Sequence, residues 1–149
     1  MDIELPEIRM KAIGIVRNEI EKPTKRDCDE TVSEIIVDSR LTEGLDNLDE
    51  FSHIIVLYWI HESPHTAPTK VRPMGNPQHE LMGVFATRSP DRPNPIGKTT
   101  VKLLERRGNI LKVKGLDAIN GTPVIDIKPY IPGYDSVDNA KAPSWMVKR

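Results

Sequence analysis

The sequence predicts a mostly β protein, built as a β-barrel or a strongly curved sheet. Several short apolar runs are separated by turn signals such as Arg107-Gly108-Asn109 and Asn120-Gly121-Thr122, a spacing typical of all-β domains. Thirteen prolines and nine glycines favour stiff connections over long helices. A length of 149 residues suits one domain with its own core, so we expect a single domain over residues 1–149.

Three apolar runs in the first half of the chain predict strands, at residues 12–16, 34–38 and 54–60. The third run, Ile-Ile-Val-Leu-Tyr-Trp-Ile, is the most apolar. It is far too short to cross a bilayer as a helix and fits a central strand. A charged segment over residues 18–31, interrupted by Pro23, predicts a loop after the first strand.

The connections around the third predicted strand differ in character. Leu41, Leu45 and Leu48 recur at helical spacing, which predicts a short amphipathic helix over residues 41–51. Residues 61–78 are rich in proline and predict a long irregular excursion. Loops of that length inside a compact domain are usually functional.

The second half of the chain predicts further strands at residues 84–87, 99–105, 110–114, 116–119 and 124–127. The last four of these form two pairs, and each of the two turn signals named above lies between the two members of one pair. The residues that follow, 128–149, show no clear periodicity.

The feature around which the chain is organised is the stretch of residues 83–98, and its proline-stiffened part, residues 88–98, is called the proline loop below. Pro90, Pro93 and Pro95 fix three φ angles and remove three N–H donors. Arg88 precedes these prolines and Arg92 lies among them, and two guanidiniums on a stiff scaffold indicate a prepared recognition surface. The alternative is that the prolines only stiffen a surface connection.

Charge and cysteine content restrict the compartment and the partners. One cysteine, Cys28, cannot form an internal disulfide, and no long apolar run is present, so we expect a cytoplasmic protein without membrane association. A net charge of −1 provides no global positive field for nucleic acid, so an RNA partner would have to meet a local basic patch. There is neither a Rossmann fingerprint nor a P-loop.

A metal site is not expected, although residues 61–65, His-Glu-Ser-Pro-His, match the letters of a zinc-protease helix. That chemistry needs both histidines one turn apart on a helix face, and Pro64 disfavours a helix there. Two other function classes stay open. One is a non-catalytic RNA-binding barrel, and the other is a metal-dependent hydrolase using His61, His65 and His79.

Residues 86–97, Ala-Thr-Arg-Ser-Pro-Asp-Arg-Pro-Asn-Pro-Ile-Gly, resemble the signature of the TsaA-like family. Further matches lie at residues 51–53, at the strand that ends in His61, and at residues 121–124 and 126–130. The family's characterised activity is the S-adenosylmethionine-dependent methylation of threonylcarbamoyl-adenosine beside the tRNA anticodon. The resemblance therefore implies a single-domain, non-Rossmann β-barrel methyltransferase, active as a homodimer, with the anticodon loop of tRNA as its partner.

The resemblance also implies the residues of the site. Carried over by position, the cofactor contacts fall on Arg26, Asp27, Cys28, His61, Glu62, Arg88, Lys98, Asp117, Ala118, Ile119 and Asn120. Methyl transfer needs two reactants held close and aligned. The substituted adenine nitrogen is a poor nucleophile until its proton leaves, and nearby cations favour that anionic form. Arg88 and Arg92 are therefore the predicted catalytic residues.

Overall fold

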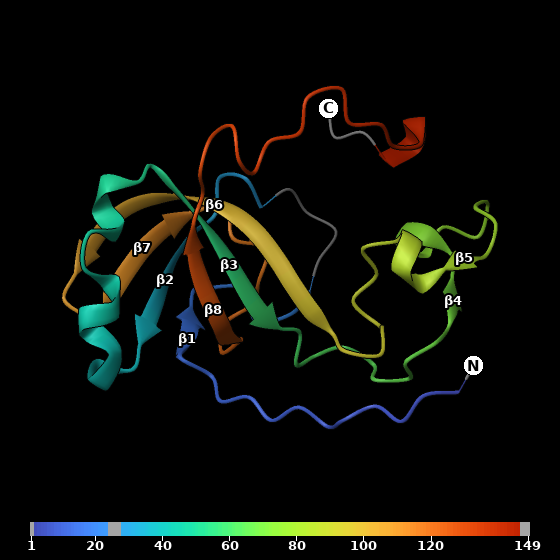
Figure 1. Ribbon diagram of the computed structural model, residues 1–149, viewed down its shortest axis with the longest axis horizontal. Coiled ribbons are helices and arrows are strands. Elements are labelled where there is room, and N and C mark those ends of the chain that lie inside the picture. The colour runs from blue at the N-terminus through green and yellow to red at the C-terminus, as the bar shows by residue number, and fades with distance from the viewer. Residues whose placement is uncertain (1, 24–27, 147–149) are drawn as a thin grey trace.

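The centre of the protein is a closed barrel of six antiparallel strands, seen in the computed structural model, which describes residues 2–23 and 28–146 (Figure 1). In barrel order the strands are β1 (Gly14–Arg17), β2 (Val32–Val37), β7 (Ile110–Lys114), β6 (Ile96–Arg107), β3 (His53–Trp59) and β8 (Pro123–Pro129). Strand β8 pairs with both β3 and β1, which closes the barrel. The predicted β-barrel is confirmed.

The barrel closes because alternate residues of its strands are aliphatic and face inward. Ile35, Ile54, Leu111 and Val113 are fully buried, as expected where side chains alternate between the two faces of a strand. The longest strand, β6, pairs with β3 along its first half and with β7 along its second half. Strand β6 therefore joins β3 to β7 within the barrel. Its N-terminal end follows directly from the proline loop.

The helix predicted over residues 41–51 is wrong in type. The chain forms two 3-10 helices, η1 (Ser39–Leu45) and η2 (Leu48–Glu50), which still bury Leu45 and Leu48 against the barrel. Asn47 adopts a left-handed conformation, with φ of 70°, between them. A residue in that region interrupts a right-handed helix, so the leucine spacing is satisfied by two separate turns.

Between β3 and β6 the chain leaves the barrel and forms a side lobe, residues 62–94 (Figure 1). The lobe contains the short ladder of β4 (Lys70–Val71) and β5 (Met82–Gly83) and the 3-10 turn η3 (Pro73–Gly75). The predicted irregular excursion thus includes a strand that pairs outside the barrel.

The strand predicted at residues 84–87 is wrong. Val84–Ala86 form the 3-10 turn η4, closed where the backbone N–H of Thr87 donates to the Val84 carbonyl at 3.1 Å. The Thr87 hydroxyl donates to the same oxygen at 2.7 Å. This turn, rather than a strand, leads into the proline loop.

The strand predicted at residues 116–119 is also wrong. Only Leu116 of this segment is fully buried, and the segment crosses the end of the barrel as an irregular connection. Side chains from distant parts of the barrel bind its carbonyls, as described below. A backbone satisfied in this way needs no strand partner.

Both ends of the described chain lie outside the barrel. Residues 2–13 and 131–146 run along opposite sides of it in Figure 1. The second segment ends in the 3-10 turn η5 (Ser144–Met146), where the Trp145 ring lies 4.9 Å from the His79 ring of the side lobe. Within residues 2–23 and 28–146, no helix combines the length and the apolar character needed to cross a membrane.

Candidate functional site

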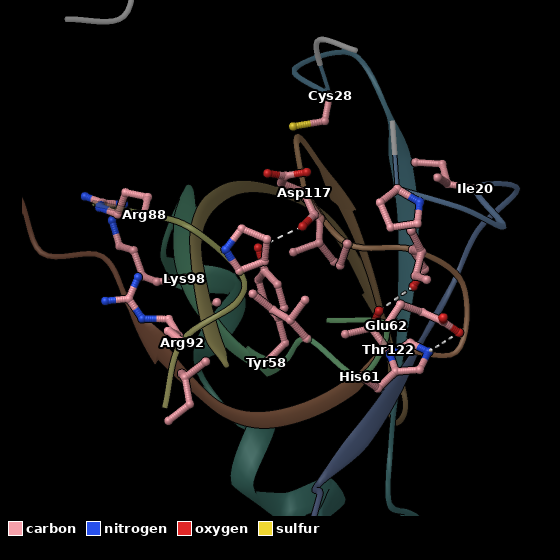
Figure 2. A pocket seen from close by; sticks show the side chains of 18 of the residues that line it. Ile20, Cys28, Tyr58, His61, Glu62, Arg88, Arg92, Lys98, Asp117 and Thr122 are labelled. Carbon is pink, nitrogen blue, oxygen red and sulfur yellow. Dashed lines mark hydrogen bonds and ion pairs between the residues drawn. The ribbon is translucent and has the colours of Figure 1, made fainter. Parts of the chain in front are cut away.

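A cavity of about 560 Å³ lies where β3 ends, β6 begins, and the connection of residues 115–122 crosses the barrel (Figure 2). Its lining comes from segments far apart in the sequence. These residues are Ile20, Pro23, Cys28, Tyr58, Ile60, His61, Glu62, Arg88, Pro90, Arg92, Asn94, Ile96, Gly97, Lys98, Leu116, Asp117, Ala118, Ile119 and Thr122.

Most of the residues predicted as site residues meet at this cavity. Those that line it are Cys28, His61, Glu62, Arg88, Arg92, Lys98, Asp117, Ala118 and Ile119. Arg26 and Asp27 lie outside the described residues. Asn120 does not line the cavity, but its side-chain oxygen accepts the backbone N–H of Asn18 at 3.1 Å and its own N–H donates to Ile20 at 2.7 Å. Asn120 therefore holds the segment that brings Ile20 to the cavity.

Tyr58 on β3 lines the cavity and was not among the predicted residues. Its hydroxyl donates to the Asp117 carbonyl at 2.8 Å and lies 2.9 Å from the Thr99 hydroxyl. Burial raises the pKa of the Tyr58 phenol to about 12. Its ring packs on Gly97, where an added Cβ would lie 2.3 Å from a ring carbon. A glycine is needed there for Tyr58 to reach Asp117.

Asn18 provides the second anchor of the connection. Its side-chain amide donates to the Ala118 carbonyl at 2.8 Å and to the Ser33 hydroxyl at 3.0 Å. Within the described residues, the backbone N–H groups of residues 117–119 donate to no other group. The middle of the connection is thus held through its carbonyls, and the N–H groups of residues 117–119 stay available at the cavity wall.

His61 and Glu62 follow directly after β3. The Nδ1 atom of His61 is buried and has no hydrogen-bond partner among the described residues, and its Nε2 lies 3.8 Å from a Glu62 carboxylate oxygen. Buried polar atoms are rarely left without a partner. His61 Nδ1 is such an unpartnered polar atom, on a residue that lines the cavity.

Three of the cavity's cationic side chains gather at one side of it. Arg88, Arg92 and Lys98 lie together at one side of it, while His61 and Glu62 lie at the other (Figure 2). The first three come from the proline loop and the start of β6. The chain has a net charge of −1 and so attracts an anionic partner only through a local basic patch. This cationic side of the cavity is such a patch.

The proline loop is also bound to residues 66–67, near the start of the side lobe. The Asp91 carboxylate accepts the N–H of Thr66 at 2.9 Å and that of Ala67 at 3.0 Å, and it accepts the Thr66 hydroxyl as well. The Thr66 hydroxyl and these N–H groups lower the pKa of Asp91. Its carboxylate is therefore ionised and directed toward residues 66–67.

The zinc-protease reading finds no support in the described part of the chain. No three histidine, cysteine, aspartate or glutamate side chains gather there in a way that could hold a metal ion. Residues 61–65 do not form a helix, and the His65 Nε2 atom lies 3.1 Å from the backbone oxygen of His61.

Comparison with known proteins gives concordant results. A family model described as the tRNA-methyltransferase O N-terminal domain matches residues 16–136. The chain is 46% identical over 139 residues to a "Probable S-adenosyl-L-methionine-binding protein" of Archaeoglobus fulgidus, covering 90% of this chain and 37% of that protein. It is 45% identical over 101 residues to the "tRNA (adenine(37)-N6)-methyltransferase" of Homo sapiens, covering 67% of this chain and 23% of the human protein.

The fold has solved counterparts. The crystal structure of TrmO from Pseudomonas aeruginosa superposes with a TM-score of 0.78 at 28% identity, over 97% of this chain and 64% of that one. The chain thus spans less than two thirds of the length of this structure and a smaller share of the two relatives named above.

Proposed function

The chain belongs to the tRNA-methyltransferase O N-terminal domain family, and from this premise we propose that it is an S-adenosylmethionine-dependent methyltransferase. The proposed reaction adds a methyl group to N6 of threonylcarbamoyl-adenosine beside the tRNA anticodon, in the cytoplasm. The observation that supports it most is the meeting of the family's proline loop with the connection of residues 115–122 at one cavity. The names of the relatives, an S-adenosylmethionine-binding protein and a tRNA methyltransferase, agree with it.

The residues at the cavity fit the cofactor. A volume of about 560 Å³ is within the range of small-molecule sites. The N–H groups of residues 117–119, which donate to no other group among the described residues, would bind its polar groups. Leu116 and Ile119 provide apolar surface for its ring. When bound, S-adenosylmethionine supplies a methyl group to N6, which releases its proton while the sulfonium becomes a thioether.

The arginines of the proline loop act on the acceptor. N6 lies between the adenine ring and the carbamoyl carbonyl, so its lone pair is delocalised and it becomes nucleophilic as its proton leaves. A fixed cation lowers the free energy of the anionic form relative to the neutral form. Arg88 lines the cavity, and no hydrogen bond or ion pair engages its guanidinium within the described chain. We assign it this role.

Three measurements test this function. Isothermal titration calorimetry should show saturable binding of S-adenosylmethionine, and transfer of labelled methyl should occur with threonylcarbamoylated tRNA and not with unmodified tRNA. The cofactor should also raise the melting temperature, because it binds the native state only. Absence of binding heat would favour the RNA-binding barrel instead, and equal methylation of both tRNAs would contradict the proposed substrate.

We also propose that the chain forms one domain and assembles as a homodimer. Large apolar side chains are exposed on both terminal segments and on the side lobe, as at Ile8 (80%), Phe85 (81%) and Tyr134 (82%). Exposed apolar groups of this kind favour association. Light scattering at micromolar concentration should report about twice the chain mass of 16.8 kDa. A monomer with full activity would contradict this proposal.

A further inference from the structure

The cationic side of the cavity lacks an acidic partner. Among the described residues, no ion pair involves Arg88, Arg92 or Lys98. The acid nearest to them in sequence, Asp91, directs its carboxylate to the backbone of Thr66 and Ala67. Three neighbouring cations without a carboxylate repel one another, so this side of the cavity favours an anionic ligand.

The guanidinium of Arg92 is oriented by the loop that carries it. Its Nη1 donates to the carbonyls of Thr87 and Ser89, each at 3.0 Å. Neither Nε nor Nη2 donates to another group within the described chain. These two nitrogens form one edge of the guanidinium, and that edge matches the two oxygens of a carboxylate. Arg92 thus presents a fixed two-donor edge.

Lys98 adds a second cation from a rigid element. It lies near the start of β6, in register with Leu57 of β3, and its exposed side chain lines the cavity on the side of Arg92 (Figure 2). Ladder pairing fixes its Cα position, while its ammonium can rotate to meet an oxygen. A pre-oriented guanidinium beside a mobile ammonium suits one carboxylate.

We propose that Arg92 and Lys98 form a subsite for the free carboxylate of the substrate nucleoside. The inference rests on the proposed function, in which the adenine carries a threonyl group with such a carboxylate. S-adenosylmethionine carries a carboxylate of its own, but its sulfonium and ammonium are cations that fit better beside Glu62, at the other side of the cavity. The subsite therefore distinguishes the modified adenosine from an unmodified one before any methyl group is transferred.

The test measures RNA binding without cofactor. Two anticodon stem-loops are compared by fluorescence anisotropy, one with N6-threonylcarbamoyl-adenosine and one with the corresponding threoninamide, which lacks only the charge. The wild-type protein should bind the carboxylate RNA about tenfold more tightly, the factor expected for one charge-assisted interaction. Lys98→Leu and Arg92→Lys should each reduce this preference to about twofold or less, because they weaken binding of the carboxylate RNA more than binding of the threoninamide RNA.

Lys102→Leu is the matched control. Lys102 is exposed on the same strand but does not line the cavity. Its replacement should therefore change the affinities for the two RNAs by the same factor, so that the preference for the carboxylate RNA is kept. Equal weakening of both RNAs by Lys98→Leu would identify a contact to phosphate and overturn the proposal. A fall in S-adenosylmethionine affinity with an unchanged RNA preference would place the subsite on the cofactor and overturn it too. If the preference is present and no methyl is transferred, the proposed reaction fails and the subsite stands.

Discussion

Replacing Arg88 by lysine should lower methyl transfer about ten- to a hundredfold, which corresponds to the 1.5–3 kcal/mol of a charge-assisted hydrogen bond. Lysine keeps the charge but removes the planar two-donor fork, so the substitution separates charge from geometry. The backbone before Arg88 is held by Thr87, which donates twice to the Val84 carbonyl. The measurement is single-turnover transfer to threonylcarbamoylated tRNA at saturating cofactor.

The stability of the Arg88→Lys variant should stay close to that of the wild type. Arg88 is exposed and makes no hydrogen bond within the described chain, so its replacement leaves no buried group without a partner. Arg88→Ala should impair transfer at least as strongly. Lys112→Ala serves as the control, because Lys112 is exposed on β7 and away from the cavity. Near wild-type transfer by Arg88→Ala would show that the proline loop is only a scaffold.

The barrel was predictable because its strands carry their own signal. The apolar run at residues 54–60 became β3, shifted by one residue, and residues 110–114 became β7 with the predicted bounds. In both strands every second residue is buried. Period-two burial requires aliphatic side chains at those positions, and that requirement is visible in the sequence.

The two wrong strands show where this signal fails. Residues 84–87 and 116–119 are apolar enough for strands, yet each places few side chains in the interior. In residues 84–87 the Val84 carbonyl accepts a hydrogen bond from the Thr87 hydroxyl. In residues 116–119 two carbonyls accept hydrogen bonds from the side chains of Tyr58 and Asn18. A short apolar run alone does not reveal whether a neighbouring strand is available to pair with it.

The residues at the cavity were predictable only in part. The proline loop is contiguous, so its arginines stand out in the sequence, and the family resemblance supplied the remaining predicted residues. Asn18 and Tyr58 were missed because their role depends on carbonyls far along the chain, 100 residues away for Asn18 and 59 for Tyr58. Tyr58 lies within an apolar strand, where an aromatic residue is expected simply as part of the core.

Tyr58→Phe should reduce the free energy of unfolding by about 0.5–1.5 kcal/mol at neutral pH, the net contribution of a typical hydrogen bond. The substitution removes the hydroxyl that donates to Asp117 and contacts Thr99 while keeping the ring on Gly97. Because the cavity wall then loses one of the two side-chain anchors of residues 117–118, the affinity for S-adenosylmethionine should fall several-fold. Urea denaturation and calorimetry measure the two effects separately.

The same hydroxyl gives the wild-type protein a characteristic pH dependence. Burial raises the pKa of Tyr58 from 10.0 to about 12 in the folded state. The unfolded chain therefore releases this proton first, and the stability that Tyr58 contributes is complete below pH 10 and is lost as the pH rises to about 12. Between pH 10 and about 12, the free energy of unfolding of the wild-type protein should fall by about 2–3 kcal/mol more than that of Tyr58→Phe. Tyr134→Phe, at an exposed tyrosine, should follow the wild-type profile. Parallel profiles of the wild type and Tyr58→Phe would contradict a buried, hydrogen-bonded phenol at the cavity.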